Sequence, residues 1–160
     1  MDYLWSPWRY QYITNAVKQP GCVFCQIFQG DDEKNFILFR GSANYVVLNI
    51  FPYTSGHLLI IPFVHTALLA ETPSETSAEM MELTKQCQAA LKQEYKPDGI
   101  NLGMNLGQAA GAGVAEHLHM HILPRWFGDI NFTTVIAETR VLPETLESTY
   151  QRLKPYFSQR

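Results

Sequence analysis

Residues His117–Leu123 read HLHMHIL, and this alternation of histidine with apolar residues constrains the fold more than any other feature of the chain. In a β-strand, successive side chains point to opposite faces of the sheet. The run therefore predicts a strand whose three histidines share one face, about 6.5–7 Å apart, with Leu118, Met120 and Ile122 facing the core. Packing alone does not explain three imidazoles on one face, because each ring has polar atoms that need partners.

Four further apolar segments predict the remaining strands of a sheet. They occupy residues 36–39, 45–50, 57–62 and 100–105. Residues 52–56, which read PYTSG, are typical of a turn. We therefore expect the segments at 45–50 and 57–62 to pair as a hairpin.

Two helices complete the pattern. Thr72-Pro73-Ser74-Glu75 predicts a helix start, with Thr72 as the cap and Pro73 in the first helical position. Apolar residues then recur at helical spacing up to the breaker at 97–99, namely Met80, Leu83, Cys87, Ala90 and Leu91. Pro143 is expected to start a C-terminal helix with Leu146, Leu153 and Phe157 inward. Strands interrupted by one long helix predict an α+β fold, with an antiparallel sheet of about five strands.

Length and charge limit the class of protein. A chain of 160 residues suits a single domain over 1–160, with an aromatic N-terminal arm and a C-terminal helical extension. The net charge of −3 argues against a surface for long nucleic acids. The sequence has neither a 20-residue apolar run nor a basic start followed by an apolar stretch, so we expect no membrane span and no signal peptide. With three cysteines, two of them as Cys22-x-x-Cys25, we expect a cytoplasmic protein.

The histidine cluster suits chemistry at phosphorus. Imidazole is partly neutral near pH 7 and is an established covalent nucleophile. A neighbouring histidine can supply a proton to a leaving phosphate. Just upstream, residues 107–113 read GQAAGAG, and small residues let backbone amides approach phosphate oxygens. Many such loops are only turns, but beside three histidines this one favours a phosphate site.

The chain resembles the histidine triad family over roughly residues 22–125. His117–Leu123 resembles the family's signature of histidines alternating with hydrophobic residues. Asn49, with the segments 55–57 and 60–62, resembles its ribose-binding strand and following hairpin. The outer segments Leu4–Arg9 and Pro124–Phe132 are similar to those of bacterial diadenosine tetraphosphate phosphorylases, which form one branch of the family.

This resemblance implies roles for individual residues. His119 would attack the α-phosphorus and form a nucleotidyl-histidine, and His121 would bind a phosphate oxygen. Asn49 would hydrogen-bond the ribose. The remaining nucleotide-binding candidates are Asn105, Gly107, Gln108, Gly113 and Val114. Gly113-Val114 stands where many relatives carry a hydroxyl that helps the leaving group, and Gln108 is a candidate substitute. The family also implies a homodimer.

A metal site is expected at the N-terminal end of the domain. Cys22 and Cys25 supply two thiolates, and the free candidates for the other two ligands of a tetrahedral zinc ion are His65 and His117. This set resembles the zinc site of galactose-1-phosphate uridylyltransferases, which are more distant relatives. The alternative is a reduced, packed thiol pair with His65 as an ordinary loop residue.

Several functions remain open at this point. The branch favours cleavage of diadenosine tetraphosphate by inorganic phosphate, and the alternatives are a dinucleoside polyphosphate hydrolase and a nucleoside phosphoramidase. A nucleotide-binding regulator with little turnover and a zinc-dependent interaction module are alternatives of other classes. Trp5, Trp8 and Trp126 either stack on an adenine or hold the arm or a dimer contact. We assign His57 no chemistry.

Overall fold

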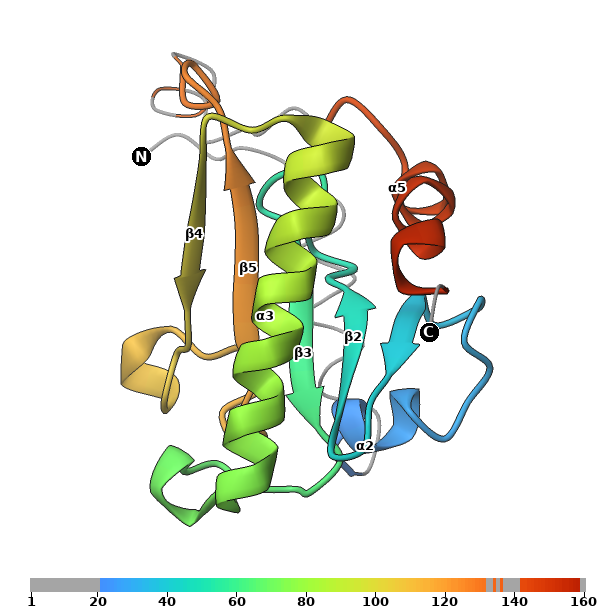
Figure 1. Ribbon diagram of the computed structural model, residues 1–160. Coiled ribbons are helices and arrows are strands. Elements are labelled where there is room, and N and C mark those ends of the chain that lie inside the picture. Colours follow the sequence, from blue (N-terminus) through green and yellow to red (C-terminus); the bar gives the residue numbers. More distant parts are fainter. Residues whose placement is uncertain (1–20, 132–133, 135, 137–141, 159–160) are drawn as a thin grey trace.

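The structure is a computed structural model that describes residues 21–131, 134, 136 and 142–158 (Figure 1). The aromatic arm with Leu4–Arg9, and therefore Trp5 and Trp8, lies outside these residues, as does Phe132. Among the helices of the described part, none is both long enough and apolar enough to cross a membrane.

A five-stranded sheet forms the centre of the molecule, with the strand order β1-β2-β3-β5-β4. Every neighbouring pair is antiparallel. The strands are β1 (Ile37–Arg40), β2 (Asn44–Leu48), β3 (Leu58–Pro62), β4 (Gly99–Gly103) and β5 (Met120–Arg125). The predicted hairpin is present, with Tyr45 opposite Ile61 and Leu48 opposite Leu58. This architecture confirms the predicted α+β class.

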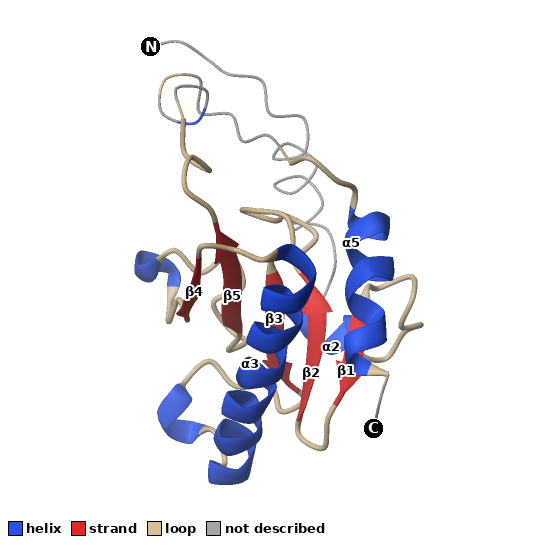
Figure 2. Cartoon of the chain, turned by 45° about the horizontal axis from the view of Figure 1, so that its top comes forward, coloured by secondary structure: helices blue, strands red, loops and turns tan. Residues whose placement is uncertain are grey.

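Helices cover both faces of the sheet. In Figure 2, α3 and α5 lie on one face and α2 lies behind it. The α-helices are α2 (Val23–Ile27), α3 (Ser74–Tyr95) and α5 (Leu146–Leu153), and the short 3-10 helices are η1 (Leu69–Glu71), η2 (Gln108–Ala110) and η3 (Lys154–Phe157). Because both faces are covered, every residue of β2 and of β3 is buried.

Two apolar clusters result from the alternation along the strands. The cluster beneath α3 and α5 contains Leu58, Ile60, Leu118 and Ile122, together with Cys87 of α3. The cluster beneath α2 contains Phe24 and the strand side chains that point to the other face of the sheet, namely Ile37, Tyr45, Val47, Leu59 and Ile61. Cys87 is fully buried, which confirms its interpretation as a small hydrophobic residue.

The helix starts differ from the predicted ones. Helix α3 begins at Ser74 with Pro73 in the cap position. The Thr72 hydroxyl donates to the carbonyl of Leu68, the residue before η1, instead of capping the helix. Helix α5 begins at Leu146, not at Pro143, because the side chain of Thr145 accepts a hydrogen bond from the Ser148 amide.

An unpredicted carboxylate fixes α3 to the β1–β2 turn. Glu79 accepts hydrogen bonds from the Ser42 and Ala43 amides at 2.6 and 2.8 Å, and from Asn44 Nδ2 at 2.8 Å. Although partial burial raises the pKa of Glu79, these donors outweigh it and lower the pKa overall. The charged carboxylate therefore orients the helix across the sheet.

Candidate active site

The three histidines of the HLHMHIL run lie on one side of the sheet, but the run is only partly a strand. β5 begins at Met120, so His117 and His119 precede it. The β3–β5 ladder ends where Ile60 faces Met120, two residues before Pro62, the last residue of β3. Proline has no amide hydrogen to donate, and the Pro62 carbonyl is already 2.9 Å from His117 Nε2. The Leu118 amide donates instead to the Thr66 carbonyl at 2.7 Å.

The predicted alternation of faces is nevertheless present. Leu118 and Ile122 are buried in the cluster beneath α3, and Met120 packs against it. His117 and His119 meet Phe24 of α2 on the other face, with ring centroids 5.6 and 4.9 Å from the phenyl ring. The rings of His119 and His121 are 4.8 Å apart, which is closer than the spacing predicted for a regular strand.

His119 is oriented by the backbone of the residue two positions before it. Its Nδ1 lies 2.9 Å from the His117 carbonyl oxygen, which can only accept a hydrogen bond, so Nδ1 carries the hydrogen. Burial lowers the pKa of His119. The ring is therefore neutral near pH 7, and its lone pair is on Nε2, as a nucleophile requires.

His121 is held between two rings. His121 Nδ1 lies 2.9 Å from His57 Nε2, and the Tyr53 ring stacks on the His121 ring with centroids 6.0 Å apart. Burial, reinforced by His119, lowers the pKa of His121 to about 4. No signal in the sequence indicated chemistry at His57, although the period of two places it on the same face as Leu59, the partner of His121.

Asn49 is connected to the triad by hydrogen bonds that pass through His57. Its Oδ1 accepts a hydrogen bond from the Phe51 amide at 2.9 Å, and its Nδ2 is 3.2 Å from His57 Nδ1. The predicted ribose-binding residue is therefore connected to His121 through one intervening imidazole.

The predicted phosphate loop joins β4 to the triad (Figure 1). Gly107 and Gly111 have φ values of 85° and 90°, a left-handed conformation that favours glycine. The residues of the predicted loop that follow Asn105, from Gly107 to Gly113, are mostly exposed. Among the described residues, no hydrogen bond joins Asn105 or Gln108 to a triad histidine. Val114 packs against the cluster that contains Phe24, which touches His119.

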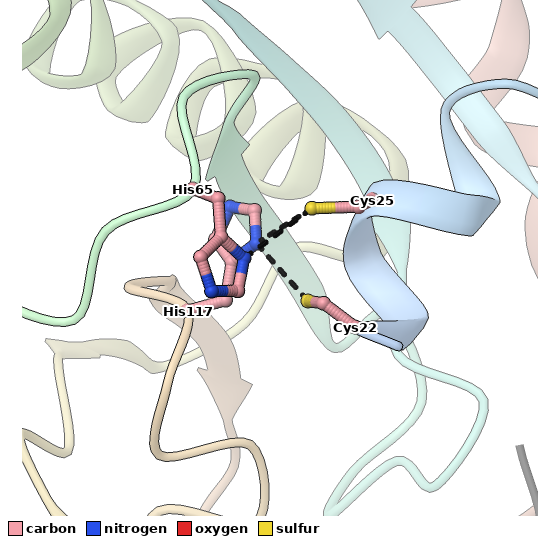
Figure 3. A group of neighbouring side chains, drawn as sticks. All are labelled: Cys22, Cys25, His65 and His117. Carbon is pink, nitrogen blue, oxygen red and sulfur yellow. Dashed lines mark hydrogen bonds between the residues drawn. The ribbon is translucent and has the colours of Figure 1, made fainter. Parts of the chain in front are cut away.

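The four predicted metal ligands form one cluster (Figure 3). The ligand atoms of Cys22, Cys25, His65 and His117 all lie within 4.8 Å of one another. His117 Nδ1 is 3.2 Å from Cys22 Sγ and 3.6 Å from Cys25 Sγ, and His65 Nδ1 is 3.3 Å from Cys25 Sγ. A tetrahedral zinc ion separates its sulfur and nitrogen ligands by about 3.6 Å. The cluster could therefore hold such an ion with small side-chain movements.

The surroundings of His117 suit a metal ligand. Its Nε2 faces the Pro62 carbonyl at 2.9 Å, so Nε2 carries the hydrogen and Nδ1 keeps its lone pair toward the two sulfurs. Burial raises the pKa of the Cys25 thiol, and Cys22 raises it further. A cation bound between the sulfurs would reverse this effect by stabilising the thiolates.

A cavity of about 720 Å³ lies at the C-terminal end of β5, between Tyr53, Tyr95, Leu123, Arg125 and Trp126. The Arg125 guanidinium is already held by the Asp129 carboxylate at 2.6 and 2.8 Å and by Asn101 Oδ1 at 2.9 Å. Its charge is therefore largely neutralised at its own end of β5. Trp126 packs edge-on against Tyr95 with ring centroids 6.4 Å apart.

Comparison with known proteins identifies similar chains. Over 158 residues the chain is 38% identical to the AP-4-A phosphorylase of Mycobacterium tuberculosis, covering 94% of this chain and 81% of that protein. A zinc-bound histidine triad family protein from Mycobacterium smegmatis superposes with a TM-score of 0.71 at 33% identity, over 87% of this chain and 94% of the other. A hypothetical histidine triad nucleotide-binding protein from Sulfolobus tokodaii gives a TM-score of 0.68 at 27% identity, over 84% of this chain and 91% of the other.

The family model described as HIT domain matches residues 31–128, which include the sheet, α3 and the triad. This match agrees with the resemblance drawn from the HLHMHIL run and with the antiparallel sheet that carries it. The chain therefore belongs to the HIT (histidine triad) family.

Proposed function

We propose that this protein is a nucleotidyltransferase that splits a dinucleoside polyphosphate, diadenosine tetraphosphate, with inorganic phosphate as acceptor. The observation that carries the proposal is the hydrogen bond from His119 Nδ1 to the His117 carbonyl, which leaves the Nε2 lone pair for attack. The similarity to the M. tuberculosis AP-4-A phosphorylase, which extends over 94% of the chain, supports this substrate and acceptor.

The reaction takes place in two displacements. His119 Nε2 attacks the α-phosphorus of one adenosine, a P–N bond forms, and the P–O bond to the β-phosphate breaks with its electrons leaving on ATP. An oxygen of inorganic phosphate then attacks the same phosphorus, which breaks the P–N bond and gives ADP. Throughout both steps the hydrogen stays on His119 Nδ1, which donates it to the His117 carbonyl, and His121 binds a phosphate oxygen.

The loop before the triad is proposed to hold phosphate. The amides of Ala110, Gly111 and Ala112 donate to carbonyls within the loop. The incoming phosphate therefore has to be bound by the other proposed donors, namely Asn105, Gly107, Gln108, Gly113 and Val114. Asn49 is proposed to bind the ribose.

We assign one zinc ion to Cys22, Cys25, His65 and His117. When bound there, zinc would be structural, because its four protein ligands leave no position for substrate. His117 would then be fixed at its ring, and its carbonyl would orient His119. Thiolate ligands require reduced cysteines, and the three cysteines are free thiols. We therefore place the enzyme in the cytoplasm.

We also propose a homodimer. β4 lies at the edge of the sheet, and Leu102 on this strand is 50% exposed. An edge strand with unpaired backbone groups and an exposed leucine suits pairing with a second copy.

Product analysis with labelled inorganic phosphate tests the proposed acceptor. The enzyme is incubated with diadenosine tetraphosphate, and the nucleotides are separated. The expected result is ATP together with ADP that carries the label. AMP without label would mean that water is the acceptor, as in the hydrolase alternative. Tight nucleotide binding with no product in either case would favour the regulator.

A further inference from the structure

A chain of hydrogen bonds leads from the backbone at Tyr53 to the triad. The Tyr53 amide lies 3.2 Å from His57 Nδ1, and Asn49 Nδ2 approaches the same nitrogen at 3.2 Å. The Asn49 amide is oriented by the Phe51 N–H, which donates to Oδ1 at 2.9 Å. A backbone N–H can only donate, so His57 Nδ1 carries the lone pair.

This arrangement determines where His57 carries its hydrogen. With Nδ1 accepting, the hydrogen is on Nε2, which lies 2.9 Å from His121 Nδ1. His121 Nδ1 is therefore the acceptor in this pair. It follows that neutral His121 carries its own hydrogen on Nε2.

Among the residues that the structure describes, the Nε2 atom of His121 is an unsatisfied hydrogen-bond donor, which indicates that a ligand binds here. His121 is only 8% exposed, and its Nε2 is buried and has no hydrogen-bond partner within the described part of the chain. A buried donor without an acceptor costs free energy, so native structures rarely keep one without a functional reason. The ring lies 4.8 Å from that of His119, so a phosphate attacked by His119 brings oxygens close to this hydrogen.

We propose that His57 is a positioning residue that fixes His121 as an Nε2–H donor to a phosphate oxygen. This inference deepens the proposed function and rests on it. His119 and His121 then have opposite tautomers. The His117 carbonyl keeps the hydrogen of His119 on Nδ1, and the Tyr53 amide, acting through His57, keeps the hydrogen of His121 on Nε2. One ring attacks while its neighbour donates, and neither has to change its protonation.

Nitrogen-15 NMR of the histidine rings tests this assignment on the free protein. The couplings between ring nitrogens and ring carbon-bound hydrogens distinguish a protonated from an unprotonated nitrogen. We expect a neutral His121 with its hydrogen on Nε2 and an unprotonated Nδ1. A neutral His121 with its hydrogen on Nδ1 would overturn the proposal without any variant.

Two variants of nearly equal size separate positioning from packing. In His57→Gln the amide NH₂ lies near the former Nε2 and can still donate, whereas the carboxylate of His57→Glu can only accept. We expect the Gln variant to keep the tautomer and to lose kcat by less than about tenfold. The Glu variant should move the His121 hydrogen to Nδ1 and lose kcat by about 100-fold or more, with a smaller change in KM. Melting curves for both variants control for folding.

The outcomes distinguish this inference from the proposed function. Equal losses of kcat in both variants, with the tautomer of His121 unchanged, would reduce His57 to a packing residue. If the tautomer is as expected but His119 forms no bond to phosphorus, the positioning stands and the proposed covalent mechanism fails. If the His119 adduct forms while His121 carries its hydrogen on Nδ1, the covalent mechanism stands and the positioning role of His57 fails. Should the Glu variant not fold, the wild-type spectrum decides.

Discussion

At the scale of single residues, His119 and His121 differ in their hydrogen-bond partners although only Met120 separates them. One ring bonds to a backbone carbonyl and the other to the His57 imidazole. The alternation in the sequence predicted correctly that the triad shares one face. It did not identify His57, because the register that sets Leu59 opposite His121 comes from strand pairing and is not encoded near His57 itself.

Replacing His119 by alanine should remove turnover. The Nε2 lone pair is the proposed nucleophile, and loss of a nucleophile typically costs at least about a thousandfold in kcat. The measurement is the initial rate with diadenosine tetraphosphate, and calorimetric binding of AMP serves as the control for an intact pocket. A variant that binds AMP and keeps more than a tenth of the wild-type rate would rule out covalent catalysis at this residue.

The stability of the protein should depend on pH through His121. Burial lowers its pKa to about 4, from an unfolded value of about 6.5. Between these values the unfolded state binds more protons, so the free energy of unfolding falls as the pH is lowered, by at most about 3–4 kcal/mol from this residue. Urea unfolding at pH 7 and at pH 4.5 should show a smaller difference for His121→Gln than for the wild type. Equal differences would contradict the assigned burial effect.

At the scale of elements, the sequence predicted the five strands, α3 and α5 within a few residues, because each has a clear apolar period. It did not predict α2, which has only five residues. The ends were harder to predict, since they depend on contacts between elements. Pro62 limits the β3–β5 ladder, so β5 begins only at Met120. Glu79 binds the β1–β2 turn, which lies more than thirty positions away in the chain. Helix α2 is joined to the segments after β3 and before β5 by the cluster of Cys22, Cys25, His65 and His117.

Removing one thiol of this cluster should loosen α2. Cys22→Ser is expected to reduce bound zinc from one equivalent to less than about a tenth, and to lower Tm by several degrees. Elemental analysis and thermal melts measure the two effects. Cys87→Ala is the matched control, because Cys87 is buried in the other cluster and its loss leaves the zinc content unchanged. Wild-type protein purified without chelator but containing no zinc would contradict the assignment.

At the scale of the whole molecule, the strand order and the two faces follow from the sequence only in part. Alternation predicted that the strands have two faces, but it did not specify that β5 lies between β3 and β4. This order places the triad strand inside the sheet and leaves β4 at its edge. The exposed edge is the physical basis for the proposed dimer.

Leu102→Glu should separate the dimer. A charge on the edge strand opposes burial against a second copy, so sedimentation at micromolar concentration should shift from twice 18.3 kDa toward 18.3 kDa. Phe127→Glu is the control, because Phe127 is 93% exposed and lies outside the strands. Wild-type protein that sediments only as an 18.3 kDa species would contradict the proposed dimer.

The stereochemical course at the attacked phosphorus tests the central claim, a nucleotidyl-His119 intermediate, most directly. A substrate with a chiral thiophosphate at the α-position is cleaved, and the configuration of the product is determined. Each in-line displacement inverts the phosphorus, so attack by His119 followed by attack by the acceptor predicts overall retention. Overall inversion would mean that the acceptor attacks the substrate directly, and it would contradict the covalent mechanism.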